Sequence, residues 1–265
     1  MKLMSIASGS KGNSIYIGSD KTSLLVDVGI SKKRIKDGLD KAGVDFKNID
    51  GILITHEHSD HISSLGIVSR SYNIPIYATS ETCDILKKKH ELGDFDKELF
   101  RCIEPDSSFT IGDIKVEAHS VCHDGVDPVC YSFFQNNKKI SIATDLGCYD
   151  DYLIEGLKDS DALLLEANHD IRMLQVGPYP YSTKQRILGK RGHLSNESSG
   201  KLLMSVLNSH IKAVLLGHLS AENNLPELAY ETVKSELIDN PYTKDVRDFN
   251  LQVVGQTGCS ELIYI

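Results

Sequence analysis

Residues 55–61, T-H-E-H-S-D-H, contain three histidines and two carboxylates directly after a short apolar stretch. Imidazole nitrogens and carboxylate oxygens are natural ligands for zinc, manganese and iron. His56 and His58 alternate along the chain, so an extended backbone points both side chains the same way, while Asp60 and His61 face a second point nearby. The loop is therefore predicted to offer two ligands to each of two metal ions.

Such a loop cannot complete two coordination shells alone, and other apolar stretches adjoin further candidate ligands. His123 precedes V-C-Y-S-F-F, Asp145 follows I-S-I-A-T, and His218 follows V-L-L-G. Each stands where a side chain can project from the end of a strand into a shared cleft. His119, four residues before His123, is an alternative candidate for the same place.

The central motif is that of a known group of enzymes. H-E-H-S-D-H resembles the H-x-H-x-D-H signature of metallo-β-lactamase-fold hydrolases. The order of Asp27, this loop, a single histidine, a single aspartate and a final histidine resembles the five motifs of that superfamily. The resemblance implies one domain over residues 1–265, an α/β fold of the αβ/βα four-layer sandwich type. Two mixed β-sheets would be flanked by helices, with two divalent metal ions (zinc, manganese or iron) at one edge between the sheets.

The resemblance also implies a role for each motif residue. One ion would be held by His56, His58 and His123, and the other by Asp60, His61 and His218. Asp145 would bridge the two ions, and Asp27 would support the ligand loop from behind. The acidic residue at position 60 is typical of members that hydrolyse esters and phosphodiesters, in which a metal-bridging hydroxide acts as the nucleophile.

Two further motifs indicate a phosphodiester substrate. L-L-L-E-A-N, which contains Glu166, and G-H-L-S-N, which contains His193, resemble stretches of the tRNA 3′-processing endonucleases of the superfamily. By that resemblance Glu166 would orient His193, and His193 would protonate the leaving oxygen as a general acid. The alternative for His193 is to cap the helix that follows it.

A basic segment, residues 171–192, is the candidate nucleic-acid surface. It has five lysines and arginines and no aspartate or glutamate, in a chain whose net charge is −8. Basic side chains with interleaved aromatic rings suit a phosphate backbone and stacked bases, although a solvated loop with a chance excess of charge remains the alternative. The candidate substrate contacts are Lys11, Asn13, His169, Tyr179, Tyr181, Lys184, Arg186, Lys190 and Arg191.

Six motifs together resemble one subfamily, the YycJ/WalJ group of bacterial metallo-β-lactamase-fold proteins. They are S-G-S-x-G-N-S, H-D-x-x-D-P, L-L-L-E-A-N-H-D, G-P-Y-P, R-G-H-L-S-N and L-x-H-L-S-x-E-N-N. The resemblance implies a 5′-to-3′ DNA exonuclease. A small-molecule hydrolase of the same fold (a cyclic phosphodiesterase or lactonase) is the alternative, and it would need neither Glu166 with His193 nor the basic segment. A non-catalytic, metal-stabilised module is a third hypothesis.

The bulk properties fit these expectations. The chain has 265 residues, 40% hydrophobic and 25% charged, which is typical of a globular protein. With a pI near 5.7, no overall positive field draws it to nucleic acid or membrane. Six cysteines without a C-x-x-C pair, no apolar leader and no run of roughly 18 apolar residues predict a cytoplasmic protein with free thiols. The oligomeric state is left open.

Strands and helices must place the candidate ligands at one edge. Helices are predicted at Lys32–Ala42, 62–70, Ser80–His90, Glu197–Ser209 and Pro226–Leu237. Strands are predicted at Leu3–Ala7, Ser14–Ile17, Ser23–Val26, Gly51–Ile54, Ile74–Tyr77, Lys115–Ala118, Val129–Phe134, Lys139–Ala143, Ala162–Glu166, Ala213–Leu216, Leu251–Val254 and Leu262–Ile265. Residues 171–192 are predicted to be the least regular part of the chain.

Overall fold

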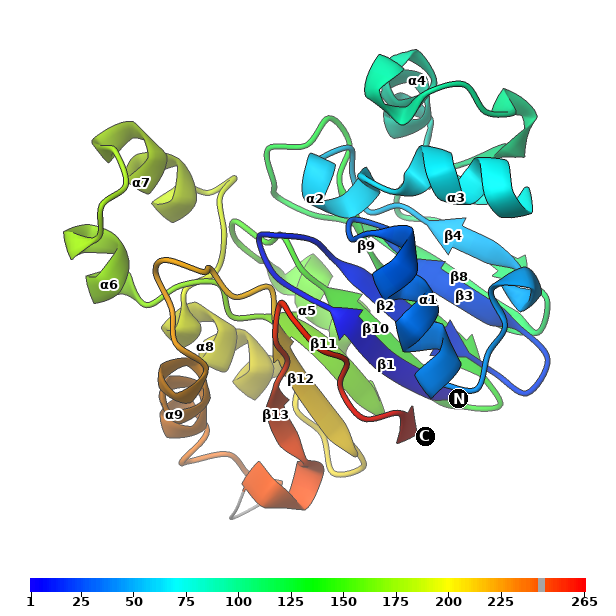
Figure 1. Cartoon of the computed structure of the whole chain (residues 1–265). Helices are drawn as coiled ribbons and strands as arrows, with labels where there is room; N and C mark the ends of the chain where they lie inside the picture. The colour runs from blue at the N-terminus through cyan, green and yellow to red at the C-terminus, as the bar shows by residue number, and fades with distance from the viewer. Residues whose placement is uncertain (243–245) are drawn as a thin grey trace.

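The computed structural model describes residues 1–242 and 246–265, and two seven-stranded mixed sheets form its centre (Figure 1). The strands of the first sheet are β1 (Lys2–Ala7), β2 (Ser14–Gly18), β3 (Ser23–Val26), β4 (Gly51–Leu53), β5 (Ile76–Thr79), β6 (Phe100–Ile103) and β14 (Ile263–Tyr264). Those of the second are β7 (Ser108–Ile111), β8 (Ile114–Ser120), β9 (Val129–Gln135), β10 (Lys138–Ala143), β11 (Ala162–Glu166), β12 (Ala213–Gly217) and β13 (Leu251–Val253).

Both sheets have a parallel half and an antiparallel half. The first runs in the order β14-β1-β2-β3-β4-β5-β6 and is parallel from β3 to β6. The second runs in the order β13-β12-β11-β10-β9-β8-β7 and is parallel from β10 to β13. Loops that follow parallel strands leave from the same edge of a sheet, which is where the candidate ligands lie.

Helices cover the outer face of each sheet. The first sheet carries α1 (Lys32–Lys41), α2 (Ser59–Ile62), α3 (Leu65–Tyr72) and α4 (Ser80–Lys88), and the second carries α5 (Asp151–Leu157), α8 (Asn196–Val206) and α9 (Pro226–Glu236). Two more helices, α6 (Ile171–Val176) and α7 (Tyr181–Leu188), stand away from both sheets at the left of Figure 1. Short 3-10 helices occupy 46–48, 90–92, 97–99 and 246–249.

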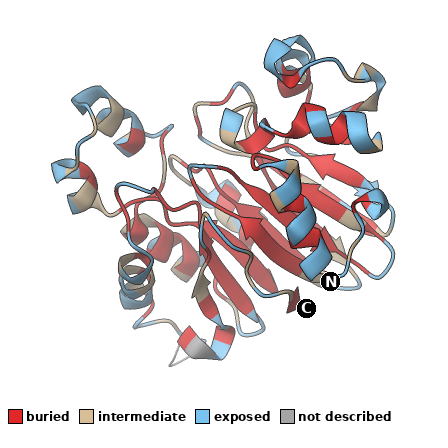
Figure 2. Cartoon of the chain, viewed as in Figure 1, coloured by how far each residue is buried: buried red, intermediate tan, exposed pale blue. Residues whose placement is uncertain are grey.

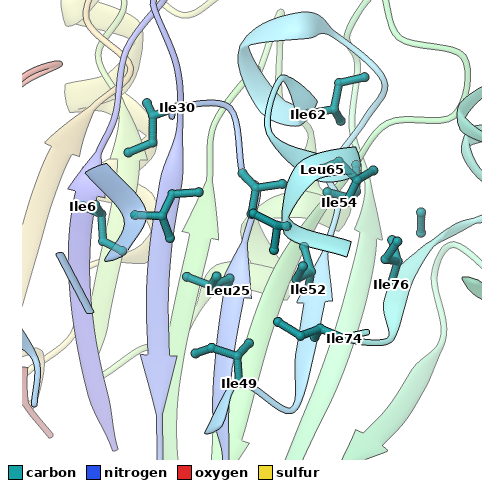
Figure 3. Packing of buried hydrophobic residues seen from close by; sticks show 14 of the residues in the cluster. Ile6, Leu25, Ile30, Ile49, Ile52, Ile54, Ile62, Leu65, Ile74 and Ile76 are labelled. Carbon is teal, nitrogen blue, oxygen red and sulfur yellow. The ribbon is translucent and has the colours of Figure 1, made fainter. Parts of the chain in front are cut away.

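Three apolar layers result, one between the sheets and one under each set of helices. The strand β11 demonstrates why: Leu163 and Leu165 pack under the helices of the second sheet, while Leu164 packs between the sheets. Such alternation is the period of two of a β-strand. Figure 3 shows the layer on the first sheet, where Leu25 and Ile52 lie on neighbouring strands and Leu65 of α3 lies beside Ile54. Figure 2 shows the strands almost wholly buried, as expected for sheets covered on both faces.

The predicted four-layer α/β sandwich is confirmed, and the predicted elements are present with small shifts at their ends. The expectation of irregular structure over residues 171–192 is wrong, because α6 and α7 lie there. Asp170 caps α6 by accepting a hydrogen bond from the Met173 amide, and Pro180 directly precedes α7. The sequence reading also missed β6, β7 and α5.

None of the helices in the described ranges combines the length and the apolar character that a membrane crossing would require.

Candidate metal centre and acid–base pair

Asp27 fastens the histidine loop that follows β4. Its carboxylate is fully buried and accepts hydrogen bonds from the amide and hydroxyl of Thr55, at 3.0 and 2.9 Å. It also accepts one from Nδ1 of His61 at 2.7 Å. This bond fixes the tautomer of His61 and leaves its Nε2 lone pair pointing into the site. A carboxylate behind a histidine is the usual support of a metal ligand.

Three candidate residues have left-handed backbone conformations directly after strands. Asp27 follows β3 with φ 59°, Asp145 follows β10 with φ 59°, and His218 follows β12 with φ 56°. A residue other than glycine costs about 1–3 kcal/mol in such a conformation and keeps it only where its surroundings hold it. The amide of His218 donates to the Ser8 hydroxyl at 2.9 Å, which is one such restraint. These turns bring the side chains together: His61 contacts both Asp27 and Asp145, and Asp145 contacts His218.

The first cluster is made of His56, His58 and His123. One ring nitrogen of each lies within 4.8 Å of the others. Nε2 of His56 is 2.8 Å from Nδ1 of His58, and Nδ1 of His123 donates to the Gly192 carbonyl at 3.0 Å. The alternative residue, His119, lies elsewhere: its Nε2 is 3.2 Å from the Ser132 hydroxyl, and it joins none of the clusters found among the described residues.

The second cluster is made of Asp60, His61 and His218, and Asp145 connects it to the first. Oδ2 of Asp60 is 3.5 Å from His61 Nε2 and 3.7 Å from His218 Nε2. Oδ2 of Asp145 is 3.3 Å from His61 Nε2, and its Oδ1 is 3.6 Å from His123 Nε2 and 3.5 Å from His218 Nε2. Asp145 therefore has an oxygen near a histidine of each cluster.

The donors fit divalent cations. Nε2 of His123, Nε2 of His218 and Oδ2 of Asp145 are buried and have no hydrogen-bond partner within the described part of the chain. Burial opposes protonation of His218, yet Asp145, Asp60 and Glu166 raise its pKa to about 10. Burial also opposes protonation of His61, but Asp27 and Asp145 raise the pKa of His61 well above its ordinary value. The site thus holds an excess of negative charge that protons or metal ions must neutralise.

Glu166, at the end of β11, is a fully buried hub beside this centre. Its Oε1 accepts a hydrogen bond from Nδ1 of His193 at 2.8 Å and lies 3.0 Å from Nδ1 of His218. Its Oε2 accepts one from the Leu146 amide at 2.7 Å. Burial favours the neutral acid, but His193 and His218 hold the pKa of Glu166 below its ordinary value. The ionised carboxylate therefore orients both histidines and the loop that carries Asp145.

His193 is a candidate proton donor at the edge of the site. Its side chain is 14% exposed, and its Nδ1 is bound to Glu166, so Nε2 is the nitrogen left to exchange a proton. It does not cap α8, because the hydroxyl of Ser195 accepts the hydrogen bond from the Ser198 amide. The same geometry brings Glu166 and His193 within 4.8 Å of Asp145 and His218, so position alone also permits a metal there.

Two of the candidate substrate contacts are buried. Asn13 accepts a hydrogen bond from the Gly9 amide at 2.9 Å, and its Nδ2 lies 3.1 Å from Nε2 of His61. Asn13 thus braces the ligand loop. His169 is 1% exposed, and burial lowers its pKa to about 4. Lys11, in contrast, is exposed on the turn between β1 and β2.

The basic segment divides into anchoring and exposed residues. Arg186 forms an ion pair with Asp124, and Arg191 donates to the carbonyl groups of His123 and Gly125, at 3.0 and 3.3 Å. Lys184 donates to the Gln175 carbonyl within the segment. The basic segment, residues 171–192, forms the α6–α7 arm, and Figure 2 shows much of this arm exposed. Its exposed residues include Arg172, Lys190 and Tyr181, while Tyr179 is half-buried.

Sequence reasoning missed two residues of the site. Thr55 joins Asp27 to the histidine loop, and Asp124 lies 3.3 Å from His123 Nε2 and 3.6 Å from His58 Nε2. Asp124 was visible as a carboxylate next to a candidate ligand. Thr55 had no signal beyond its place at the start of the loop.

Comparison with known proteins agrees with the fold and the motifs. Residues 22–218 match the family described as "Beta-lactamase superfamily domain". The chain is 39% identical to "Exodeoxyribonuclease YycJ" of Bacillus anthracis, over 88% of this chain and 87% of that protein. It is 40% identical to "Exodeoxyribonuclease WalJ" of Streptococcus pneumoniae serotype 2, over 88% and 86%.

Solved structures share the fold at low identity. Zinc-bound PqqB from Methylobacterium extorquens superposes with a TM-score of 0.72 at 16% identity, over 98% of this chain and 100% of that one. The short form of human tRNase Z gives a TM-score of 0.67 at 16% identity, over the whole of both chains.

Proposed function

Since the chain belongs to the β-lactamase superfamily and, within it, to the YycJ/WalJ family, we propose that it is a metal-dependent 5′-to-3′ DNA exonuclease. The observation that carries the proposal is the Glu166–His193 pair at 2.8 Å, directly beside a centre of histidines and carboxylates. This combination suits hydrolysis of a phosphodiester, because a general acid beside the metal centre can protonate the leaving sugar oxygen. The two relatives named exodeoxyribonuclease support DNA as the substrate. We also propose a cytoplasmic location, where a DNA substrate would be available.

The centre is proposed to hold two divalent ions, zinc, manganese or iron. The ions would supply the positive charge that lowers the pKa of the attacking water and stabilises the charge on the phosphoryl group. The residues proposed to hold them are His56, His58 and His123 for one ion, Asp60, His61 and His218 for the other, and Asp145 for both.

The protein's own residues then position the ligands and move the proton. Asp27 accepts a hydrogen bond from Nδ1–H of His61 and so holds the ring with Nε2 of His61 facing Asp60 and Asp145. Glu166 holds Nδ1 of His193 in the same way, which leaves the Nε2 proton of the imidazolium for the leaving oxygen. The carboxylate also stabilises the charge of that imidazolium. Asp60, on the same loop as His61, would bind the second ion from a position between His61 and His218.

The test is cleavage of end-labelled duplex DNA, single-stranded DNA and RNA, each with manganese, with zinc and with chelator. The expected result is metal-dependent stepwise loss from the 5′ end of DNA. An Asp145→Ala protein purified in parallel excludes a contaminating nuclease. Cleavage of RNA in preference to DNA would change the substrate. No cleavage of any polymer, with hydrolysis of cyclic phosphodiesters or lactones, would replace the proposal by a small-molecule hydrolase.

The exposed basic residues of the arm are expected to contact the phosphate backbone. Arg172→Glu together with Lys190→Glu should weaken DNA binding at low salt, because counterion release drives much of such binding. The slope of log affinity against log salt should fall by about one for each lost phosphate contact. Fluorescence anisotropy of labelled duplex DNA across a salt series measures both quantities.

The matched control is Lys21→Glu with Lys47→Glu. Both lysines are exposed and lie where β2 ends and β4 is about to begin, at the sheet edge opposite the candidate ligands. This pair makes the same change in net charge. An equal loss of affinity in both double variants would show that overall charge, and not the arm, governs binding.

A further inference from the structure

Asp124 is a carboxylate at the first histidine cluster that has no role in the mechanism above. Its Oδ1 lies 3.3 Å from Nε2 of His123 and 3.6 Å from Nε2 of His58. This oxygen is buried and accepts no hydrogen bond from any of residues 1–242 or 246–265. The other oxygen, Oδ2, is bound by the guanidinium of Arg186. One half of the carboxylate is thus satisfied, and the other half faces the histidines.

The tautomer of His123 makes this arrangement unfavourable without a cation. The Gly192 carbonyl can only accept, so the hydrogen bond at 3.0 Å places the proton of His123 on Nδ1. Nε2 then presents a lone pair. That lone pair faces Oδ1 of Asp124 at 3.3 Å and Oδ1 of Asp145 at 3.6 Å. Three electron-rich atoms at such distances repel one another unless a positive charge lies among them.

We propose that Asp124 is an additional donor to the metal ion held by His56, His58 and His123. The inference rests on the proposed metal centre, and it adds a residue to it. Arg186 fixes the direction of the carboxylate by holding Oδ2, which leaves Oδ1 for the ion. The α6–α7 arm, which carries Arg186, is thereby joined to the metal centre through Asp124, in addition to the contacts of Arg191 with the carbonyl groups of His123 and Gly125.

A second carboxylate donor, in addition to Asp145, changes which ion the site prefers. Imidazole nitrogens suit zinc, whereas each added carboxylate oxygen shifts a site toward harder ions such as manganese. The added negative charge also strengthens binding of any divalent ion. Asp124 is therefore a determinant of both affinity and metal choice at the first cluster.

Direct metal binding tests this inference without any need for activity. Purified metal-free Asp124→Asn and Asp124→Ala proteins are titrated with Mn²⁺ and Zn²⁺ against a competing chelator, and bound metal is counted by elemental analysis. Both variants should bind one ion about 10- to 100-fold more weakly, with a larger loss for Mn²⁺ than for Zn²⁺. The second ion should bind as in the unaltered protein. The visible spectrum of the Co²⁺-loaded protein should change at one site only.

Two controls separate a donor from a structural anchor. Asp127→Asn removes a carboxylate from the same loop. Burial and the neighbouring Glu81 raise the pKa of Asp127, and Thr79 opposes this, so no candidate ligand is among its main partners. This variant should bind both ions normally. Arg186→Met removes only the partner of Oδ2 and leaves Oδ1 in place, so metal affinity should fall by less than in either Asp124 variant.

The outcomes are distinct. Normal metal binding by both Asp124 variants would overturn the inference and leave the proposed nuclease standing. An equal loss in Asp124→Asn and Arg186→Met would also overturn it, because Asp124 would then act by anchoring the arm. If the unaltered protein takes up no divalent ion, the proposed metal centre itself fails.

Discussion

Asp145→Ala is expected to lower the rate of DNA cleavage by about 10³-fold or more. The carboxylate lies between four histidines, with oxygens 3.3 to 3.7 Å from His61, His218, His123 and His193. Its removal takes one donor from both proposed ions and leaves more of their positive charge uncompensated. Bound metal should therefore fall together with activity. Elemental analysis and single-turnover cleavage of labelled duplex DNA measure the two losses.

The substitution also changes a strained backbone position, and a second aspartate controls for this. Asp159 has the same φ of 59° but is exposed and precedes β11, at the end of that strand opposite Glu166. Asp159→Ala removes the same side chain from the same conformation, so it should cost similar stability and leave activity and metal content unchanged. If Asp145→Ala keeps full activity, Asp145 cannot be the shared ligand. If both variants lose activity in proportion to stability, the effect is one of folding.

The second large effect is expected from the acid–base pair. His193→Ala should slow cleavage of DNA by about 10²- to 10⁴-fold, the usual contribution of a general acid, while metal content stays normal. Glu166→Gln should slow cleavage by at least as much and should also weaken metal binding. The difference arises because Glu166 holds Nδ1 of His218 at 3.0 Å as well as Nδ1 of His193. Elemental analysis therefore distinguishes the two variants.

A substrate with a good leaving group isolates the proton transfer. A p-nitrophenyl ester of thymidine 5′-phosphate expels p-nitrophenolate, which needs no proton. His193→Ala should therefore lose little of its rate on this ester compared with DNA. An equal loss on both substrates would rule out the general-acid role. A loss of metal from His193→Ala would make His193 a ligand, which its nearness to Asp145 and His218 permits. His210→Ala, at an exposed histidine outside the centre, serves as the control.

The choice between His119 and His123 was within reach of the sequence and depended on where β8 ends. The sequence reading ended this strand at Ala118, which left the direction of His119 open. In the structure β8 continues to Ser120, and Val116 and Ala118 pack between the sheets. Alternation then turns His119 to the outer face, where it lies against Gly156 of α5. The ligand loops were predictable because each adjoins a strongly apolar strand.

The missed elements lack such a pattern. In β6 the two middle residues are both exposed, so hydrophobic periodicity gives no strand signal. In β7, S-F-T-I, exposed residues do alternate with more buried ones, but the run is only four residues long. The basic arm shows a different limit of sequence reasoning. Composition detects five positive charges but not their partners, and Arg186 and Arg191 prove to be bound to the loop around His123. Contacts between residues more than 60 positions apart depend on the finished fold.

The centre draws its donors from both sheets: His56, Asp60 and His61 follow β4 of the first, whereas Asp145 and His218 follow β10 and β12 of the second. In the unfolded chain these residues are scattered over a span of more than 150 positions, and no preformed site exists. Any free energy gained on binding metal is therefore free energy of folding, and it grows with the concentration of free ion. An ion held there acts as a reversible cross-link between the two halves of the sandwich. The supply of metal in the cell would then set the lifetime of the folded protein as well as its activity.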